Sequence, residues 1–297
     1  MAIRLGSNRY GKAENRLVSI ARDTARHEIR DLNVSTALRG DFADAHVTGD
    51  QSAVLPTDTQ KNTVFAFAKK HGIGEIEDFA LTLARHFVAD VATVTEARVE
   101  VEEYAWDRIA VGGAGHDHAF SRGGSDRRST VVTVDGDGAW VLSGISDLVV
   151  LKSTGSEFAG FRNDEYTTLA ETEDRILATS LIVRWRYTGT DVDWTAAYEG
   201  IRRTLLETFA TTHSLALQQS LYAMGRAALE AYPQVAELRF SAPNKHHFAY
   251  DLESFGLDNP NEVFHAADRP YGLIEATVVR DDAPAGGPAW DAVPGFC

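Results

Sequence analysis

The sequence predicts an α+β protein with two similar halves, each an antiparallel four-stranded sheet that carries two helices on one face. Strand-like stretches alternate apolar and polar residues, as half-buried strands do. Between them lie pairs of longer stretches whose apolar residues recur three and four positions apart, which is typical of amphipathic helices. Both patterns run in the same order before and after the turn-forming segment Asp135-Gly136-Asp137-Gly138. We therefore place a domain boundary in this turn, between a first domain of residues 1–136 and a second of residues 137–297.

The first half follows the order strand, strand, helix, helix, strand, strand. Its predicted strands cover residues 16–24, 27–39, 98–106 and 130–134, and its predicted helices cover residues 61–70 and 76–91. Along the second helix, Phe79, Leu83 and Phe87 fall on one stripe, so this helix is expected to pack against an apolar surface. The glycine-rich stretch over residues 112–124 is expected to be a connection.

The second half repeats this order in its pattern, although not visibly in its residues. Its predicted strands cover residues 139–153, 176–187, 237–252 and 272–280, and its predicted helices cover residues 194–213 and 215–232. The strand over 176–187 alternates clearly, with Leu181, Val183 and Trp185 on one side. Ser214 lies between the two helices and is the predicted N-cap of the second.

A sheet with helices on one face leaves its other face and its edges uncovered. Copies of the chain that join their sheets edge to edge into a barrel would close these edges. The sequence therefore predicts a homo-oligomer, with binding sites at the interfaces between copies.

The charge balance argues against nucleic acid as a partner. Lys and Arg number 29 against 43 Asp and Glu, and the resulting net charge of −14 would repel a phosphate backbone. An anionic ligand would have to meet positive charge supplied locally by individual Lys or Arg residues. No stretch approaches the roughly 18 continuous apolar residues of a membrane span, so no membrane association is expected.

Cysteine usage and the N-terminal residues favour a reducing compartment. Cys297 is the only cysteine, which excludes an intramolecular disulfide, a cysteine-rich zinc site and an iron–sulfur cluster. The N-terminal residues lack the apolar run of a secretory signal. We expect a soluble protein that is not exported.

Three polar residues of the first half are candidates for chemistry. Lys12 is predicted to precede the first strand, where a lone lysine is usually solvated. Thr57 and Asp58 begin a Thr-Asp-Thr-Gln segment that fits a helix capping box. Such a helix start also gathers backbone donors where an anion or a developing oxyanion can bind. A structural and a chemical role are thus both open.

Four residues of the second half are polar candidates with equally simple alternatives. Arg175 follows Asp174 at the start of a strand, and an ordinary ion pair would explain it. Gln218 falls in the first turn of the last helix, where a surface glutamine is common. Asn244 and His246 share one side of an extended segment and could together hold a water or a small oxidant.

A metal site is a further possibility. His116 and His118 lie on one side of an extended segment and could provide two ligands, but a site needs a third or fourth. We favour histidines that bond within a loop, and we expect no metal.

Taken together, these segments resemble the urate oxidase family over essentially the whole chain. Six groups of residues occur in the family's order: Tyr10-Gly11-Lys12; Thr57-Asp58 through Lys61-Asn62-Thr63; Val150-Leu151-Lys152-Ser153-Thr154 with Glu157-Phe158; Asp164-Glu165-Tyr166-Thr167-Thr168-Leu169; Asp174-Arg175-Ile176-Leu177; and Gln218 with Pro243-Asn244-Lys245-His246. The resemblance implies two tandem tunnelling-fold domains in a homotetramer with active sites at subunit interfaces. It also implies oxidation of urate by O₂ and water to 5-hydroxyisourate and hydrogen peroxide, without a cofactor.

The resemblance also assigns roles to the site residues. Arg175 and Gln218 would grip the edge of the purine, and Phe158 would stack on its face. Lys12 and Thr57 would handle protons, with His246 extending the relay. Asn244 would hold oxygen, peroxide or water above the ring.

Two neighbouring positions complete the implied site. Asp58 would join Thr57 in reaching it from the adjacent subunit. Leu217 stands where relatives may carry a smaller branched residue, a change that matters little if its backbone N–H contacts the substrate.

One departure concerns location. The C-terminal residues Gly295-Phe296-Cys297 differ from the Ser-Lys-Leu peroxisomal signal of eukaryotic relatives, so we expect a bacterial cytoplasm. Two alternatives stay open at this point. One is a zinc-dependent pterin or purine hydrolase of the same fold, with His116, His118 and His246 as ligands; the other is a purine-binding protein without turnover.

Overall fold

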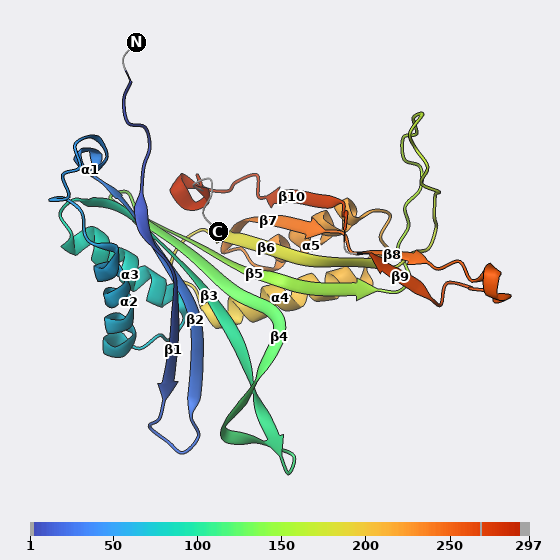
Figure 1. Cartoon of the computed structure of the whole chain (residues 1–297), viewed down its shortest axis with the longest axis horizontal. Helices are drawn as coiled ribbons and strands as arrows, with labels where there is room; N and C mark the ends of the chain where they lie inside the picture. Colours follow the sequence, from blue (N-terminus) through green and yellow to red (C-terminus); the bar gives the residue numbers. More distant parts are fainter. Residues whose placement is uncertain (1–2, 268, 292–297) are drawn as a thin grey trace. The chain divides into compact units, whose positions relative to one another are not determined.

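The computed structural model describes residues 3–267 and 269–291 (Figure 1). The chain divides into two compact units. Unit 1 takes the chain up to Gly144, then Arg186–Thr195 and the segment from Pro284 onward. Unit 2 takes Ile145–Trp185 and Ala196–Ala283.

Unit 1 contains the first strands and helices of the chain. Its strands are β1 (Tyr10–Ala21), β2 (Glu28–Gly40), β3 (Val94–Val111), β4 (Ala114–Asp135) and the first part of β5 (Ala139–Lys152), hydrogen-bonded in that order. Its helices are α1 (Ala43–Val47), α2 (Thr57–His71), α3 (Ile76–Asp90) and the 3₁₀ helix η2 (Gly287–Trp290). The pairs β1–β2, β2–β3 and β3–β4 are antiparallel.

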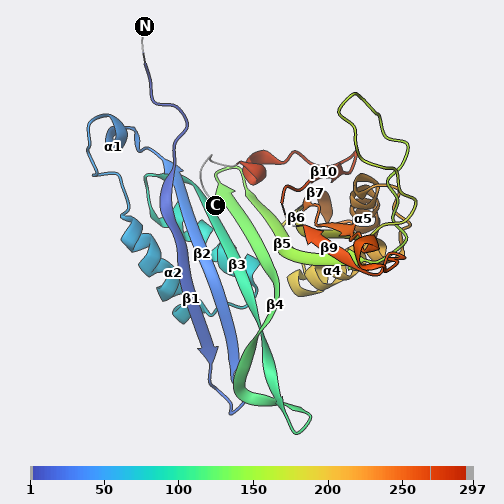
Figure 2. The same ribbon diagram turned by 45° about the vertical axis from the view of Figure 1, so that its right-hand side comes forward.

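The core of unit 1 lies between this sheet and its two long helices. Figures 1 and 2 show α2 and α3 on the same face of the strands, where α2 contacts β1 and α3 contacts β3 and β4. Leu32, Val34 and Leu38 alternate along β2 and are fully buried. The predicted stripe of α3, including Phe79 and Leu83, is buried as well. The amphipathic pattern thus identified both the helix and its inward side.

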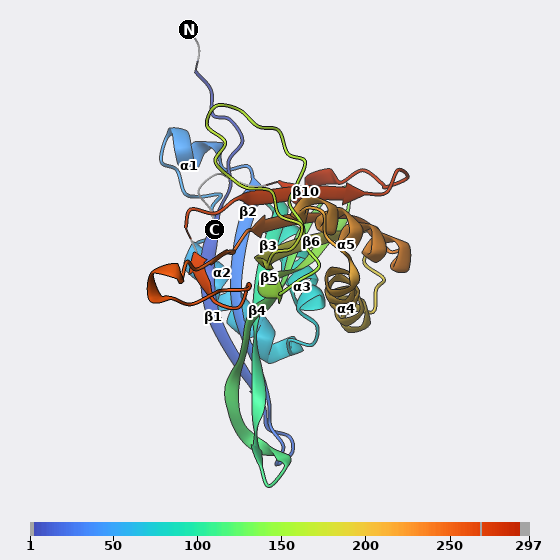
Figure 3. The ribbon, with the colours of Figure 1, turned by 90° about the vertical axis from the view of Figure 1, so that its right-hand side faces the viewer.

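Unit 2 has the same kinds of element. Its strands are the second part of β5, most of β6 (Leu177–Tyr187), β7 (Val235–Pro243) and β10 (Leu273–Val279), with a separate pair made by β8 (His246–Ala249) and β9 (Phe264–Ala267). Its helices are most of α4 (Trp194–Thr211), α5 (Leu217–Ala231) and the 3₁₀ helix η1 (Glu253–Phe255). Figure 3 shows α4 and α5 side by side, and α5 contacts β7 and β10.

The predicted α+β class with antiparallel strands is confirmed. The predicted turn after β4 is also present, because Asp135 N donates to Gly138 O at 3.0 Å. Among the helices within residues 3–267 and 269–291, none is long and apolar enough to cross a membrane.

Two predictions about strands in unit 1 were wrong. Tyr10, Gly11 and Lys12 do not precede the first strand but lie inside β1, paired with Leu38, Ala37 and Thr36. The glycine-rich residues 112–124 are not a loop, because most of them extend β4 along β3. In both places backbone hydrogen bonds to the neighbouring strand outweigh the weak strand propensity of the residues.

The two predicted helix caps were also wrong. Helix α2 begins after Pro56, no side chain caps its N-terminus, and Gln60 bonds instead with Thr36 Oγ1, which donates at 2.8 Å. Helix α5 begins after Ala216, and the hydroxyl of Ser214 donates to the carbonyl of Ala216. Neither Thr57 nor Ser214 thus caps the helix for which it was predicted.

The predicted strand over residues 237–252 is broken. Strand β7 ends at Pro243, which has no N–H to continue the ladder, and β8 starts at His246. The partner strand β9 and the short helix α1 were not predicted from the sequence.

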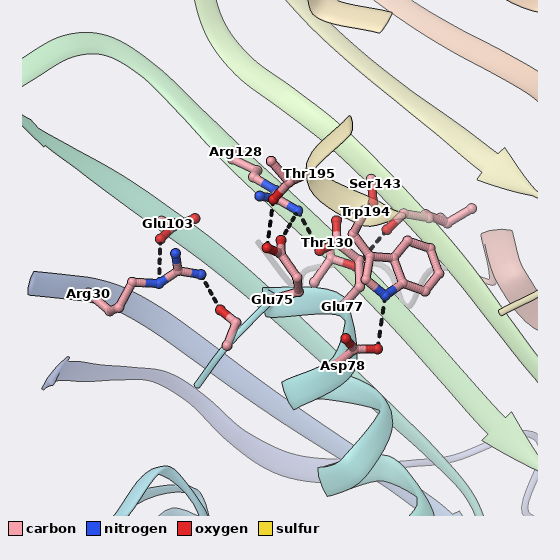
Figure 4. A network of polar contacts seen from close by, with 12 residues as sticks. Arg30, Glu75, Glu77, Asp78, Glu103, Arg128, Thr130, Ser143, Trp194 and Thr195 are labelled. Carbon is pink, nitrogen blue, oxygen red and sulfur yellow. Dashed lines mark hydrogen bonds and ion pairs between the residues drawn. The ribbon is translucent and has the colours of Figure 1, made fainter. Parts of the chain in front are cut away.

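A buried ionic network joins the start of α3 to the sheet of unit 1 (Figure 4). The guanidinium of Arg128 on β4 donates to Glu75 Oε2 at 2.8 Å and to Glu77 Oε2 at 2.7 Å. Ser143 on β5 donates to the other oxygen of Glu77 at 2.5 Å. Burial raises the pKa of Glu77, although the charge of Arg128 acts against this. Glu77 is therefore a fully buried carboxyl that depends on its two partners.

The same network holds the first residues of α4. Trp194 Nε1 donates to Asp78 Oδ1 at 2.9 Å, and Thr195 Oγ1 donates to Glu75 Oε1 at 2.6 Å. One carboxylate, Glu75, thus serves both the β4 arginine and the α4 threonine. These contacts lie within unit 1.

Candidate active site

The predicted site residues of unit 1 lie where β1 meets the start of α2. Lys12 sits next to an irregularity of β1 at which the pairing with β2 shifts. Thr57 is the first residue of α2 and Asp58 the second. The pKa of Asp58 is lowered, chiefly by the hydrogen bond from Lys61, and the charge of Lys12 contributes as well. Helix α2 contacts β1, so the strand that carries Lys12 lies beside the helix that begins with Thr57.

Two contacts fix this arrangement. The hydroxyl of Tyr10 donates to the carbonyl of Leu55 at 3.0 Å, which ties β1 to the segment before α2. The side chain of Gln60 is buried against Thr36 of β2, as described above. The backbone on both sides of Lys12 and Thr57 is thus anchored to the core.

In unit 2, the predicted site is organised around Arg175 and Phe158. The guanidinium carbon of Arg175 lies 5.1 Å from the centroid of the Phe158 ring. Burial lowers the pKa of Arg175, and its Nε is buried without a hydrogen-bond partner. Phe158 in turn stacks on Phe161, with centroids 4.9 Å apart and planes 18° from parallel. A half-buried cation with an unused donor beside an aromatic face suits a planar anion.

Backbone hydrogen bonds hold these two residues together. Arg175 N donates to Ser156 O at 2.8 Å. Phe158 and Thr172 exchange two bonds, of 2.8 and 3.0 Å. The segments that carry Phe158 and Arg175 therefore pair like two short strands.

The start of α5 is tied to the same segments. Glu157 N donates to Ser214 O at 2.7 Å, and Ser214 N donates to Gly155 O at 3.0 Å. Ala216 is the N-cap residue of α5, and Leu217 and Gln218 are the first two residues of the helix. Leu217 is buried at 2% exposure, whereas Gln218 is exposed.

Asn244 and His246 approach the start of β6. Lys245 N donates to Ala178 O at 2.8 Å, and Asn244 forms a β-bridge with Thr179. Ala178 and Thr179 lie at the start of β6, three and four residues after Arg175 in the sequence. His246 begins β8, and its ring stacks on that of Phe248 with centroids 5.6 Å apart. The predicted site residues of unit 2 are therefore linked by direct hydrogen bonds between their segments.

The site as predicted falls into two groups. Lys12, Thr57 and Asp58 belong to unit 1, and the others belong to unit 2. Asp174, Ser156 and Ser214 connect the unit 2 segments and were not predicted as site residues. One signal in the sequence pointed to Asp174, which directly precedes Arg175 in one of the segments that resemble the urate oxidase family.

The histidines considered as metal ligands form a cluster of their own. His116 and His118 have ring centroids 4.5 Å apart, and His27 lies 5.8 Å from His118. His246 belongs to the other unit. Within residues 3–267 and 269–291, no three His, Cys, Asp or Glu side chains are arranged to hold a metal ion.

Comparisons with known proteins agree with one another. The family model described as Uricase matches residues 8–133 and 141–275. The chain is 55% identical to the uricase of Arthrobacter globiformis over 293 residues, covering 99% of this chain and 95% of the relative. It is 39% identical to the uricase of Oryctolagus cuniculus over 278 residues, covering 91% of this chain and 93% of the relative.

Solved structures give the same result. The crystal structure of uricase from Arthrobacter globiformis matches with a TM-score of 0.94 and 54% identity, covering 98% of this chain and all of that one. A uricase from Bacillus fastidious matches with a TM-score of 0.79 and 25% identity, covering 94% and 95% of the two chains. The chain belongs to the uricase family.

Proposed function

We propose that this chain oxidises urate with O₂ and water, giving 5-hydroxyisourate and hydrogen peroxide. Membership of the uricase family makes it an oxidoreductase. The structural observation that carries the proposal is Arg175, whose half-buried guanidinium lies over Phe158 with Nε unpaired. A flat purine anion offers what this arrangement lacks, namely a negative edge for the cation and a face for the ring.

The substrate grip is proposed to come from unit 2. Arg175 gives charge-assisted hydrogen bonds, and the amide of Gln218 donates and accepts at the purine edge. Phe158 stacks on the ring, and Leu217 offers its backbone N–H. Three contacts along the edge of the ring and one on its face fix the orientation in which the ring meets oxygen.

Proton handling is proposed to come chiefly from unit 1. Lys12 acts through the hydroxyl of Thr57, and Asp58 joins Thr57 in binding the substrate. His246 extends the relay, and Asn244 holds oxygen, peroxide or water above the ring. An electron-rich urate dianion can itself reduce O₂, so the protein need only deprotonate, orient and stabilise charge, and no cofactor is proposed.

We also propose the assembly that would join the two groups. Residues 1–136 and 137–297 would form tandem tunnelling-fold domains, and four chains would form a homotetramer whose barrels place Thr57 and Asp58 of one chain at the site of the next. The edge strand β1 supports this, because Val18 and Ile20 on it are 55% and 40% exposed. A single cysteine fits the cytoplasm as the location.

The zinc hydrolase alternative has no support in the comparisons, whose matches are uricases. A metal assay would still be a useful control, because zinc bound in stoichiometric amount and lost with activity would contradict the cofactor-free proposal.

The first prediction concerns the reaction itself. In air, after treatment with a chelator, the purified protein is expected to consume urate, measured as a fall in its ultraviolet absorbance, and to release one hydrogen peroxide per urate. The stoichiometry follows from the balance of urate, O₂ and water against the two products. Unchanged absorbance in the presence of O₂ would contradict the proposed function.

The second prediction tests the substrate grip. Arg175→Ala is expected to lower kcat/KM for urate by about 100- to 1000-fold, since two hydrogen bonds to a charged group are lost. Arg175→Lys should recover only part, because an ammonium cannot make the bidentate contact. Arg226→Ala, which removes an exposed arginine of α5, is the matched control and should leave kcat/KM unchanged.

Mixed oligomers extend this test to the proposed assembly. Thr57→Ala chains and Arg175→Ala chains, each expected to have little activity alone, are co-expressed with different affinity tags. If each site takes Thr57 from one chain and Arg175 from another, random mixing restores about a quarter of the sites. Mixed oligomers that stay inactive would show that both residues act within a single chain.

A further inference from the structure

Asp174 directly precedes Arg175, yet its carboxylate bonds elsewhere. Asp174 Oδ1 accepts hydrogen bonds from Thr154 Oγ1 at 2.9 Å and from Gly155 N at 3.2 Å. The ordinary Asp174–Arg175 ion pair that the sequence allowed is not formed in the described part of the chain. The carboxylate of Asp174 therefore stabilises the turn at Thr154 and Gly155, and the guanidinium of Arg175 can bind another anion.

The turn that Asp174 fastens leads to Phe158. Gly155 has a φ of 71°, in the left-handed region that favours glycine, and the chain bends there. Its carbonyl accepts the bond from Ser214 N on the connection before α5. One carboxylate thus holds a turn that also contacts the segment leading to Gln218.

Three successive contacts join this turn to the Arg175 segment. The first is the Asp174 side chain on Thr154 and Gly155, the second is Arg175 N on Ser156 O, and the third is the backbone pair of Phe158 with Thr172. Only the first is made by a side chain. It can therefore be removed by substitution while the two backbone contacts remain.

The backbone of Asp174 is itself held in place. Thr172 Oγ1 donates to Asp174 O at 2.7 Å and accepts from Asp174 N at 3.3 Å. This local turn directs the carboxylate across to Gly155. The contact is thus part of a formed turn and does not depend on a freely moving side chain.

We propose that Asp174 is a positioning residue for the substrate grip: by holding the turn at Thr154 and Gly155, it sets how Arg175 lies against the ring of Phe158. The inference rests on the proposed function, in which these two residues bind the planar anion. Bidentate guanidinium contacts are sensitive to geometry, and a misplacement of about 1 Å can cost about 100-fold in rate. Asp174 acts through its neighbours and does not touch the substrate.

The experiment measures urate binding separately from turnover. Urate is titrated into each variant under argon, where it binds without reacting, and KM and kcat are then measured in air. Asp174→Ala is expected to raise both Kd and KM about 10- to 100-fold, with a smaller effect on kcat. Asp174→Asn keeps an acceptor oxygen at the same place and should bind urate within about 3-fold of the parent.

Two further variants separate positioning from a general loss of structure. Glu171→Ala removes a similar contact, in which Glu171 Oε1 accepts from Gly160 N at 2.9 Å in the same region, and should leave Kd unchanged. Thr154→Val removes one of the two donors to Asp174 and should weaken binding by less than Asp174→Ala. The Tm and oligomeric state of every variant are measured, and binding is compared among variants that match the parent in both.

Several outcomes would overturn the inference. They are an Asp174→Ala variant that binds urate like the parent, an Asp174→Asn variant as weak as Asp174→Ala, or an equal loss in Glu171→Ala. The parent protein distinguishes this result from failure of the proposed function. If the parent consumes urate and Asp174→Ala matches it, only the positioning role is lost, whereas an inactive parent contradicts the function itself.

Discussion

Replacing Lys12 by alanine is expected to lower kcat for urate by about 100- to 10,000-fold, the usual range for removing a general acid or base. Thr57→Ala is expected to fall in the same range, because the two side chains are proposed to pass one proton. Both residues are half-buried near the start of an element and neither belongs to the core, so folding and assembly should persist. Steady-state kinetics and size-exclusion chromatography on the same samples measure the two effects.

Matched substitutions separate chemistry from position. Thr57→Ser keeps the hydroxyl and should recover most of the lost rate, while Thr59→Ala removes a hydroxyl two residues along the same helix and should have no effect. Lys69→Ala removes a charge from the exposed far end of α2 and is the matching control for Lys12→Ala, with no expected effect on kcat. A Lys12→Ala variant with the parent's kcat would remove the proton-handling assignment and leave the substrate grip of unit 2 untouched.

Periodicity predicted those parts of the fold in which burial selects one side of an element. Helix α3 was predicted within one residue at its end, because Phe79, Leu83 and Phe87 must all face the sheet. The start of β1 was missed, because Gly11 and Lys12 carry no apolar alternation and are held there by backbone pairing with β2. Such pairing depends on a strand distant in sequence, and local pattern does not report it.

The candidate site was predicted from resemblance more than from physics. Nothing local to Arg175 distinguishes it from an arginine paired with Asp174, and the structure was needed to show that the carboxylate bonds to Thr154 and Gly155 instead. The capping-box interpretation of Thr57 was wrong for a related reason. Gln60 lies three residues after Thr57, as a capping box requires, but its side chain bonds with Thr36 of β2, which the local pattern cannot reveal.

The second large effect is on stability. Arg128→Ala is expected to lower the free energy of unfolding by about 3–5 kcal/mol, the cost of leaving a buried charge without its partner. The side chain of Arg128 is 11% exposed, and its removal leaves the fully buried carboxylate of Glu77 with Ser143 as its one remaining side-chain partner among the described residues. Calorimetry at one scan rate and one protein concentration should show Tm lower by roughly 10 °C.

The control is again Arg226→Ala, whose pair with Glu230 has a similar distance of 2.7 Å but is 65% and 62% exposed. Solvent screens that pair, so its loss should leave Tm unchanged. A drop in Tm as large as that of Arg128→Ala would show that burial does not decide the effect.

The loss of stability caused by Arg128→Ala should depend on pH through the carboxyls of Glu77 and Glu75. Burial raises the pKa of Glu77, and without the charge of Arg128 this pKa rises further. In the variant, the ionised form of Glu77 therefore destabilises the folded protein at neutral pH, and this loss of stability disappears as the pH falls through the folded pKa. Burial acts to raise the pKa of Glu75, but Thr195 and Arg128 together lower it, so the stability that Arg128 adds through Glu75 is present above the unfolded pKa and is lost in acid. Both contributions have the same sign. The difference in Tm between parent and variant should therefore be largest near about pH 8 and shrink towards about pH 5, and a difference that grew on acidification would contradict the role of the buried carboxylates.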